Sequence, residues 1–88
     1  MKLIGKQKLK LFDKSQISFR TWLVNWIAEV SSNACQWNNV NEISDQYPRS
    51  FKKDGEKFLF EIADSGFILE AKVVFPQKII LIQDIRKK

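Results

Sequence analysis

The sequence predicts an α+β fold: a short N-terminal strand and two to three helices packed on one face of a small antiparallel meander sheet. Two observations predict it. Apolar residues recur with the helical period in the first half of the chain and alternate with period two in the second half. The length of 88 residues, 44% of them hydrophobic, suits a single domain over residues 1–88 with one core.

The first fourteen residues combine two patterns. Residues 2–4 favour a short strand, whereas residues 6–13 are ambiguous, because Leu9 and Phe12 fit a helix and Lys8–Leu11 alternates like a strand. We expect a helix there.

Residues 14–32 carry the clearest helical pattern. Asp13 and Gln16 form a weak version of a capping box at its start. Aromatic stripes with this period are normally what a helix buries, so we interpret the two tryptophans on it as core residues rather than as a cofactor platform. The apolar stripe consists of Phe19, Trp22, Leu23, Trp26, Ile27 and Val30.

A second, short helix is predicted after Asn39. Asn39 is a favourable N-cap with Glu42 at the third helical position, and Val40, Ile43 and Tyr47 share one face. Pro48 then ends the helix.

Three strands joined by short turns are expected after residue 50. They follow the Asp54-Gly55 turn signal and are separated by turns at 64–66 and 76–77, which predicts an antiparallel meander. The predicted strands are Lys57–Ile62, Phe67–Phe75 and Lys78–Ile85.

The alternation also predicts the register. Ile62 should lie near Phe67 and Phe60 near Leu69, so that one apolar face, with Ile80 and Ile82, packs under the helices. The opposite face is mixed, as in sheets that meet a ligand or partner. It should carry Lys57, Leu59, Glu61, Ile68, Glu70, Lys72, Val74, Ile79, Leu81, Gln83 and Ile85.

In this register Lys57 lies opposite Lys72, and like charges across a strand pair are unfavourable. Either Glu61 and Glu70 neutralise the two lysines, or an anion of the size of a phosphate occupies the space between them.

The composition excludes several classes of function. The chain has no histidine, which excludes His-based metal sites and Ser–His or Cys–His mechanisms. Its single cysteine, Cys35, allows no internal disulfide and fits a cytoplasmic protein. The isolated glycines form no phosphate loop, and no apolar segment is long enough to cross a membrane. We therefore expect no metal, no cofactor and no membrane partner.

The net charge of +5 suggests an anionic partner. Without histidine, one reaction class fits the remaining side chains: metal-free RNA cleavage, in which the substrate's 2′-hydroxyl attacks the adjacent phosphate. The protein then supplies orientation, cations and a base, and a lysine crowded by other cations can be that base. Phosphate contacts would suit the Lys52-Lys53 pair and the terminal Arg86-Lys87-Lys88 run.

Several segments resemble one family in the same order. They are Trp26–Val30, the Ala34-Cys35-Gln36-Trp37-Asn38-Asn39 step, the helix closed by Tyr47-Pro48, Lys53-Asp54-Gly55, Phe60–Ile62 and the last two strands. Together they resemble HigB-type toxins of the RelE superfamily.

The resemblance implies a ribosome-dependent endoribonuclease that cleaves messenger RNA and inhibits translation, with a HigA-like helix-turn-helix antitoxin as partner. It places Lys53, Lys57 and Lys72 at or near positions where the family carries basic residues, and we assign them to catalysis. We assign Lys52, Lys53, Lys78, Arg86 and Lys87 to RNA binding.

An alternative is a catalytically degenerate relative that binds only a partner protein or RNA. Ser65-Gly66-Phe67-Ile68 stands where the family typically has Asn, an aromatic residue and Arg, and the family's His and Tyr after the last strand have no counterpart. A third, weaker alternative is a general basic RNA-binding module, although the sheet lacks exposed aromatic pairs that stack bases.

Overall fold

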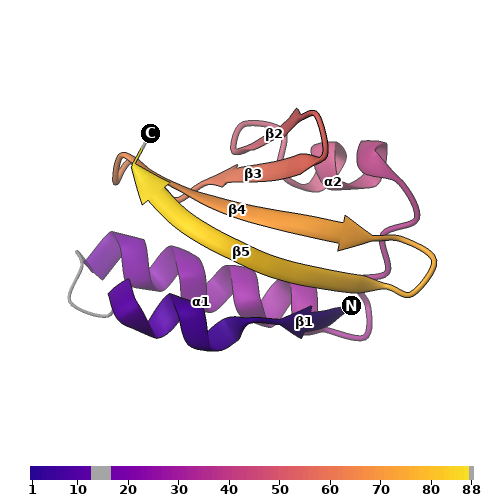
Figure 1. Cartoon of the computed structure of the whole chain (residues 1–88), viewed down its shortest axis with the longest axis horizontal. Helices are drawn as coiled ribbons and strands as arrows, with labels where there is room; N and C mark the ends of the chain where they lie inside the picture. Colours follow the sequence, from indigo (N-terminus) through magenta and orange to yellow (C-terminus); the bar gives the residue numbers. More distant parts are fainter. Residues whose placement is uncertain (13–16, 88) are drawn as a thin grey trace.

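The computed structural model describes residues 1–12 and 17–87, with the backbone alone for residues 10–12. The weak cap expected at Asp13 and Gln16, the side chain of Phe12, and Lys88 lie outside the described residues. The elements are β1 (Lys2–Ile4), the 3-10 helix η1 (Lys6–Phe12), α1 (Ile17–Ser31), α2 (Val40–Gln46), β2 (Phe51–Asp54), β3 (Lys57–Glu61), β4 (Phe67–Val74) and β5 (Ile79–Lys87) (Figure 1).

The sheet has five strands in the order β1-β5-β4-β3-β2. Strands β2 to β5 form an antiparallel meander, but β1 pairs with β5 in parallel, with Lys2 opposite Ile79. The sheet is therefore mixed, and the expectation of a purely antiparallel sheet is wrong. The N-terminal strand joins the free edge of the last strand, a non-local pairing that no local pattern reports.

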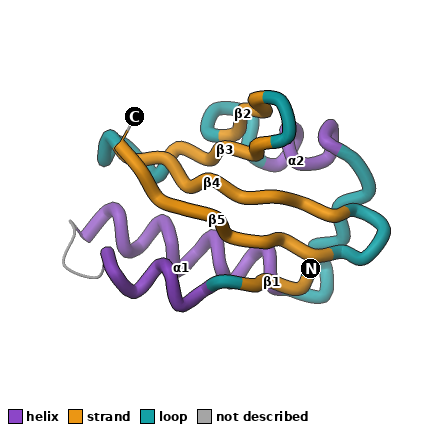
Figure 2. The backbone as a smooth tube through the Cα atoms, in the orientation of Figure 1, coloured by secondary structure: helices purple, strands orange, loops and turns teal. Residues whose placement is uncertain are grey.

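Helix α1 lies across one side of the sheet, as the α+β prediction expects (Figures 1 and 2). Its stripe is buried at Phe19, Leu23, Trp26 and Val30. The Trp26 ring meets Phe60 of β3 edge to face, with 5.3 Å between centroids. Trp26 is thus a core residue, as its position on the stripe predicts, and aromatic contacts of this kind add to the burial of the rings.

Helix α2 begins at the predicted N-cap, Asn39, which forms a full capping box with Glu42. The Asn39 side chain accepts a hydrogen bond from the Glu42 N–H at 3.2 Å, and the Glu42 carboxylate accepts one from the Asn39 N–H at 3.2 Å. Ile43 is fully buried, and Tyr47 caps the C-terminal end. The second predicted helix is confirmed.

Two elements differ from expectation. Residues 6–12 form a 3-10 helix, and residues 51–54 form an additional strand, β2, in a hairpin with β3. Only Phe51 of β2 is buried, so this edge strand offers no alternating apolar pattern to recognise.

The predicted register is confirmed where β3 meets β4. Phe60 lies opposite Leu69, and the Ile62 N–H donates to the Phe67 carbonyl at 3.0 Å. Ile80 and Ile82 are fully buried on the same face.

A β-bulge in β5 changes the side of the sheet on which Ile85 lies. Glu70 pairs with Asp84 and Ala71 with Ile82, which leaves Gln83 as an extra residue. The extra residue reverses the alternation after it, so Ile85 lies opposite Leu69 and is buried in the core. Its expected place on the mixed face is wrong.

The N-terminal end of the described chain is held at the far end of α1. The Met1 ammonium donates to the carbonyls of Val30 and Cys35, each at 2.8 Å. Carbonyls at the end of a helix carry partial negative charge, which favours a cation there. Gly5 then brings the chain past β5, since a Cβ at Gly5 would lie 2.9 Å from the Ile82 carbonyl oxygen.

Candidate functional site

The face of the sheet turned away from α1 and α2 is called the open face below. Its side chains follow from the register, because residues that alternate with the buried ones lie on it. It carries Lys2, Ile4, Lys52, Asp54, Lys57, Leu59, Glu61, Ile68, Glu70, Lys72, Val74, Ile79, Leu81, Asp84 and Arg86.

Lys57 and Lys72 lie side by side on the open face. The ladder that pairs Phe58 with Ala71 brings them next to each other at its end, and both are exposed. They line a hollow of about 390 Å³ whose other walls are Asp54, Glu56, Ala71 and Gln83.

The hollow therefore combines two ammonium groups with two carboxylates and one amide. Such a set can bind an anion and can also accept a proton. Sequence reasoning assigned no role to Asp54, Glu56 or Gln83. The Asp54-Gly55 turn signal could have indicated the two carboxylates, because they lie on either side of that turn. Gln83 is the extra residue of the bulge in β5, and the alternating pattern of the sequence gives no sign of that bulge.

Glu70 neutralises part of this face, as one of the two sequence interpretations expects. Its Oε1 lies 3.9 Å from the Lys57 Nζ and 3.4 Å from the Arg86 Nε. Within the part of the chain that the structure describes, Lys72 has no such ion pair. Lys72 is thus the more available of the two lysines for an external anion.

The other predicted site residues are distributed over both sides of the molecule. Lys52 pairs with Leu59 and lies on the open face, whereas Lys53 pairs with buried Phe58 and so points to the side of the core. Lys87 pairs with Phe67 and also lies on the side of α1. The structure therefore does not bring Lys53 together with Lys57 and Lys72.

The side-chain ammonium group of Lys78 is hydrogen-bonded within the protein. Its Nζ donates to the Trp37 carbonyl at 2.8 Å and to the Asn38 side chain. These bonds join the turn before β5 to the segment before α2. An RNA contact by Lys78 would have to replace them.

The open face is close to electrically balanced. Its register positions include five basic residues (Lys2, Lys52, Lys57, Lys72 and Arg86) and four acidic ones (Asp54, Glu61, Glu70 and Asp84). The net charge of +5 for the chain is thus mostly located elsewhere. Any binding of RNA to this face depends on local arrangement more than on a broad positive potential.

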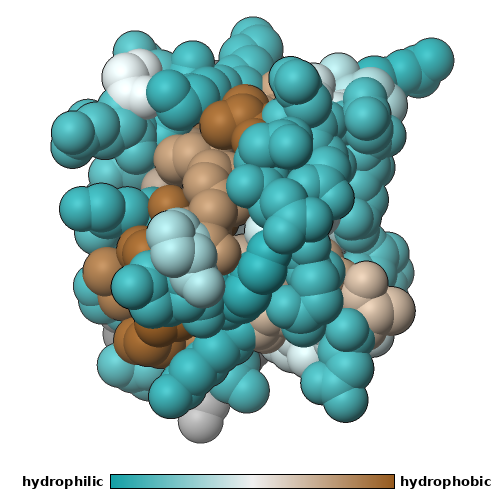
Figure 3. Space-filling model, turned by 90° about the vertical axis from the view of Figure 1, so that its right-hand side faces the viewer, coloured by the Kyte–Doolittle hydropathy of each residue, from teal (hydrophilic) through white to brown (hydrophobic). Residues whose placement is uncertain are grey.

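Apolar side chains interrupt the charges of the open face. Ile4 is 40% exposed, and Val74, Ile79 and Leu81 beside it are half-buried. Figure 3 shows a band of apolar surface between hydrophilic side chains at the end of the molecule that faces the viewer. The mixed character predicted for this face is therefore present in the structure.

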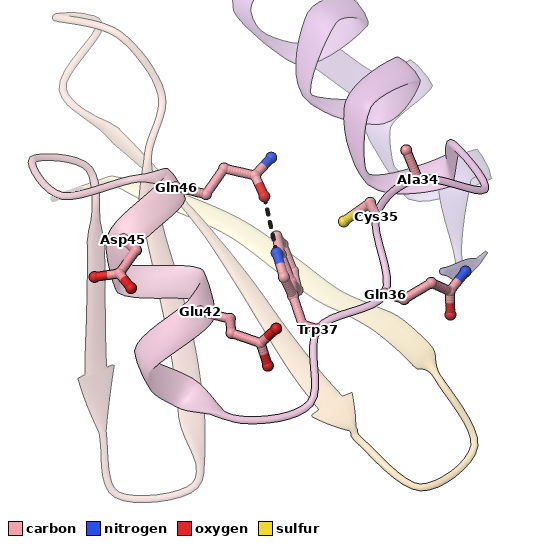
Figure 4. A pocket seen from close by; sticks show the side chains of 7 residues that line it. All are labelled: Ala34, Cys35, Gln36, Trp37, Glu42, Asp45 and Gln46. Carbon is pink, nitrogen blue, oxygen red and sulfur yellow. Dashed lines mark hydrogen bonds between the residues drawn. The ribbon is translucent and has the colours of Figure 1, made fainter.

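A second hollow, of about 450 Å³, lies between α2 and the segment that follows α1 (Figure 4). The Trp37 indole N–H donates to Gln46 Oε1 at 2.9 Å, so its polar atom is already satisfied. Burial raises the pKa of the Cys35 thiol, only partly offset by the N-terminal ammonium, and a protonated thiol is a weak nucleophile. This hollow is therefore a weaker candidate for a catalytic site than the one at Lys57 and Lys72.

Residues 1–12 and 17–87 contain no group of three or more Cys, Asp or Glu side chains that could hold a metal ion. None of the described helices is long and apolar enough to cross a membrane.

Comparison with protein-family models gives no match for this chain, and no curated protein is significantly similar to it.

Proposed function

We propose that this chain is a HigB-like toxin with a RelE-like fold that cleaves messenger RNA on the ribosome. A HigA-like antitoxin is its proposed partner, and the cytoplasm is its proposed location. The observation that carries the proposal is the juxtaposition of Lys57 and Lys72 beside a hollow that also contains carboxylates. The order of the elements and the mixed open face agree with the resemblance described above and support the proposal.

The hollow contains the groups that a metal-free cleavage needs. The 2′-oxygen of the RNA attacks the adjacent phosphorus while Asp54 or Glu56 accepts the proton of the 2′-hydroxyl. Lys72 stabilises the negative charge that develops on the phosphate oxygens, and Lys57 orients the backbone. The bond to the 5′-oxygen breaks, that oxygen takes a proton from water, and the products carry a 2′,3′-cyclic phosphate and a 5′-hydroxyl.

The test is expression of the chain without any antitoxin, with growth and RNA 5′ ends as readouts. We expect growth arrest and new 5′-hydroxyl ends within messages. Lys72→Ala should reduce cleavage by about 10²- to 10³-fold, the effect of losing one group that stabilises transition-state charge.

Lys53→Ala is the matched control, because it removes the same charge from the side of the sheet that faces the core. We expect it to retain cleavage. Normal growth and intact messages at high expression of the unaltered chain would contradict the proposal.

A second candidate function is binding without catalysis. The near balance of charge on the open face and the internal contacts of Lys57, Lys78 and Arg86 favour it. In that case a partner protein or RNA is captured with no change in translation. RNA cleavage by the purified chain that disappears in Lys72→Ala would exclude this candidate.

A further inference from the structure

One carboxylate on the open face is shared by two cations from different strands. Glu70 stands in the middle of β4, Lys57 approaches it from β3, and Arg86 approaches it from β5. We infer that the Glu70 carboxylate occupies the position of an RNA phosphate and that RNA binding displaces it from Lys57 and Arg86. The inference deepens the proposed function and rests on it, since it adds a phosphate subsite beside the hollow.

The register explains why the two cations converge on Glu70. Lys57 starts from the row of Lys72, on one side of Glu70, and Arg86 starts from the row of Ile68, on the other side. Both side chains therefore reach diagonally across the sheet toward the centre of β4. Diagonal neighbours in a sheet are within reach of long side chains.

The contacts themselves are loose. Both cations approach the same oxygen, Oε1, and Arg86 does so through its Nε at 3.4 Å rather than through a two-pronged pairing. Charge-assisted hydrogen bonds are typically about 2.7 to 2.9 Å long. A phosphate group, with more acceptor oxygens, would satisfy both cations better than this single carboxylate oxygen does.

Solvent exposure makes the exchange possible. The side chains of Lys57 and Arg86 are 56% and 45% exposed, whereas that of Glu70 is 14% exposed. Both cations are thus accessible to an RNA phosphate, and the cost of the exchange lies in leaving the mostly buried Glu70 carboxylate without them. RNA that neutralises two cations also releases its own counterions, which favours the exchange at low salt.

Asp84 provides a matched control for the role of Glu70. It lies directly opposite Glu70 on β5, and its Oδ1 accepts a hydrogen bond from the Ile85 N–H at 2.9 Å. Among the described residues it forms no ion pair. Glu70→Gln and Asp84→Asn therefore raise the net charge equally on the same face. Only Glu70→Gln releases Lys57 and Arg86.

The experiment measures binding of a short, fluorescein-labelled single-stranded RNA by anisotropy across a series of salt concentrations. Both variants should bind more tightly than the unaltered chain because of the added positive charge. We expect the affinity of Glu70→Gln to exceed that of Asp84→Asn by on the order of tenfold, because RNA no longer has to displace a carboxylate from Lys57 and Arg86. The slopes of log affinity against log salt should be similar, since the same two cations contact phosphate in every complex.

Further substitutions at Arg86 and Lys57 show whether these two cations bind the RNA phosphate. Adding Arg86→Gln to Glu70→Gln should lower the affinity and make the salt slope shallower by about 0.7, the effect of one lost phosphate contact, and adding Lys57→Gln as well should do the same again. Thermal unfolding by circular dichroism should show that each variant is folded at the temperature of the binding measurement, so that a change in affinity reports the phosphate subsite.

The outcomes separate this inference from the proposed function. Equal RNA affinity of Glu70→Gln and Asp84→Asn would overturn the inference and leave cleavage to be judged by RNA 5′ ends. A selective gain for Glu70→Gln in a chain that never cleaves RNA would support the phosphate subsite and contradict the toxin proposal. No RNA binding by any version at low salt would overturn both.

Discussion

At the scale of single residues, Tyr47 joins the two helices. Its hydroxyl donates to the Glu29 carboxylate of α1, and its ring meets Phe60 edge to face with 5.7 Å between centroids. Burial of the ring, followed by the hydrogen bond and the charge of Glu29, raises the pKa of Tyr47 above its ordinary value of 10.0. Each of these effects disfavours the phenolate form.

This shift predicts a loss of stability at alkaline pH. Because the folded pKa of Tyr47 exceeds the unfolded one, its contribution is fully present below pH of about 10 and is lost as the pH rises through the folded pKa. Tyr47 is the chain's single tyrosine, so tyrosinate absorbance reports this residue alone. We expect it to titrate at higher pH in the folded protein than in denaturant.

Tyr47→Phe is the control for this titration. It should abolish the tyrosinate signal and flatten the dependence of stability on pH above about 10, where Tyr47 ionises when unfolded. Coincident titration curves for the folded and denatured chain would contradict the shift.

Lys78 shows how far a residue's role can be predicted from sequence. Its charge and its place before β5 suited phosphate binding, yet it bonds to Trp37 and Asn38, about forty positions earlier in the chain. A lysine's partner depends on which segments the fold brings together, and composition carries no record of that.

At the scale of elements, the cap of α2 is open to a direct test. Asn39→Ala removes the acceptor of the Glu42 N–H and should lower the free energy of unfolding by about 1 kcal/mol. Asn41→Ala, at an exposed position inside the same helix, should leave stability unchanged or raise it slightly, because alanine favours helices. Urea unfolding measures both, and equal effects of the two substitutions would contradict the capping box.

The elements with a strong local period could be predicted, and those defined by pairing could not. The stripe of α1, the cap of α2 and the facing of Phe60 and Leu69 all follow from local spacing. Strand β2 is an edge strand with three charged residues, and the bulge at Gln83 is visible only in the pairing of β4 with β5.

The same distinction between local period and strand pairing applies to the candidate site. The alternation of β3 and β4 predicts that Lys57 lies beside Lys72 and near Glu70, as the structure shows. The position of Lys53 depends on β2, which the sequence did not reveal, so its separation from the other two lysines was not foreseeable. Asp54 and Glu56 enter the hollow through the same hairpin.

At the scale of the whole molecule, β5 is the strand on which the sheet depends. It lies between β1 and β4 and buries Ile80, Ile82 and Ile85. Burying an isoleucine side chain contributes about 2 kcal/mol, so three of them represent much of the 5 to 15 kcal/mol by which a typical domain is stable.

A chain that ends at residue 78 should therefore fail to fold. We expect it to lose its near-ultraviolet circular dichroism and to show the fluorescence of solvent-exposed tryptophan. A chain that ends at residue 86 keeps all three buried isoleucines and should retain the native signals. Native signals from the shorter chain would mean that β5 is dispensable.

The position of β5 also determines when, during synthesis, the sheet can form. The ribosome makes residues 79–87 after every other described element, yet this strand lies inside the sheet. Until it emerges, β4 has an unpaired edge, β1 has no neighbour, and Arg86 has not yet joined Lys57 at Glu70. Before β5 emerges, the nascent chain is thus aggregation-prone and lacks its finished charged face. It acquires its stability and this surface in one step, when β5 joins the sheet.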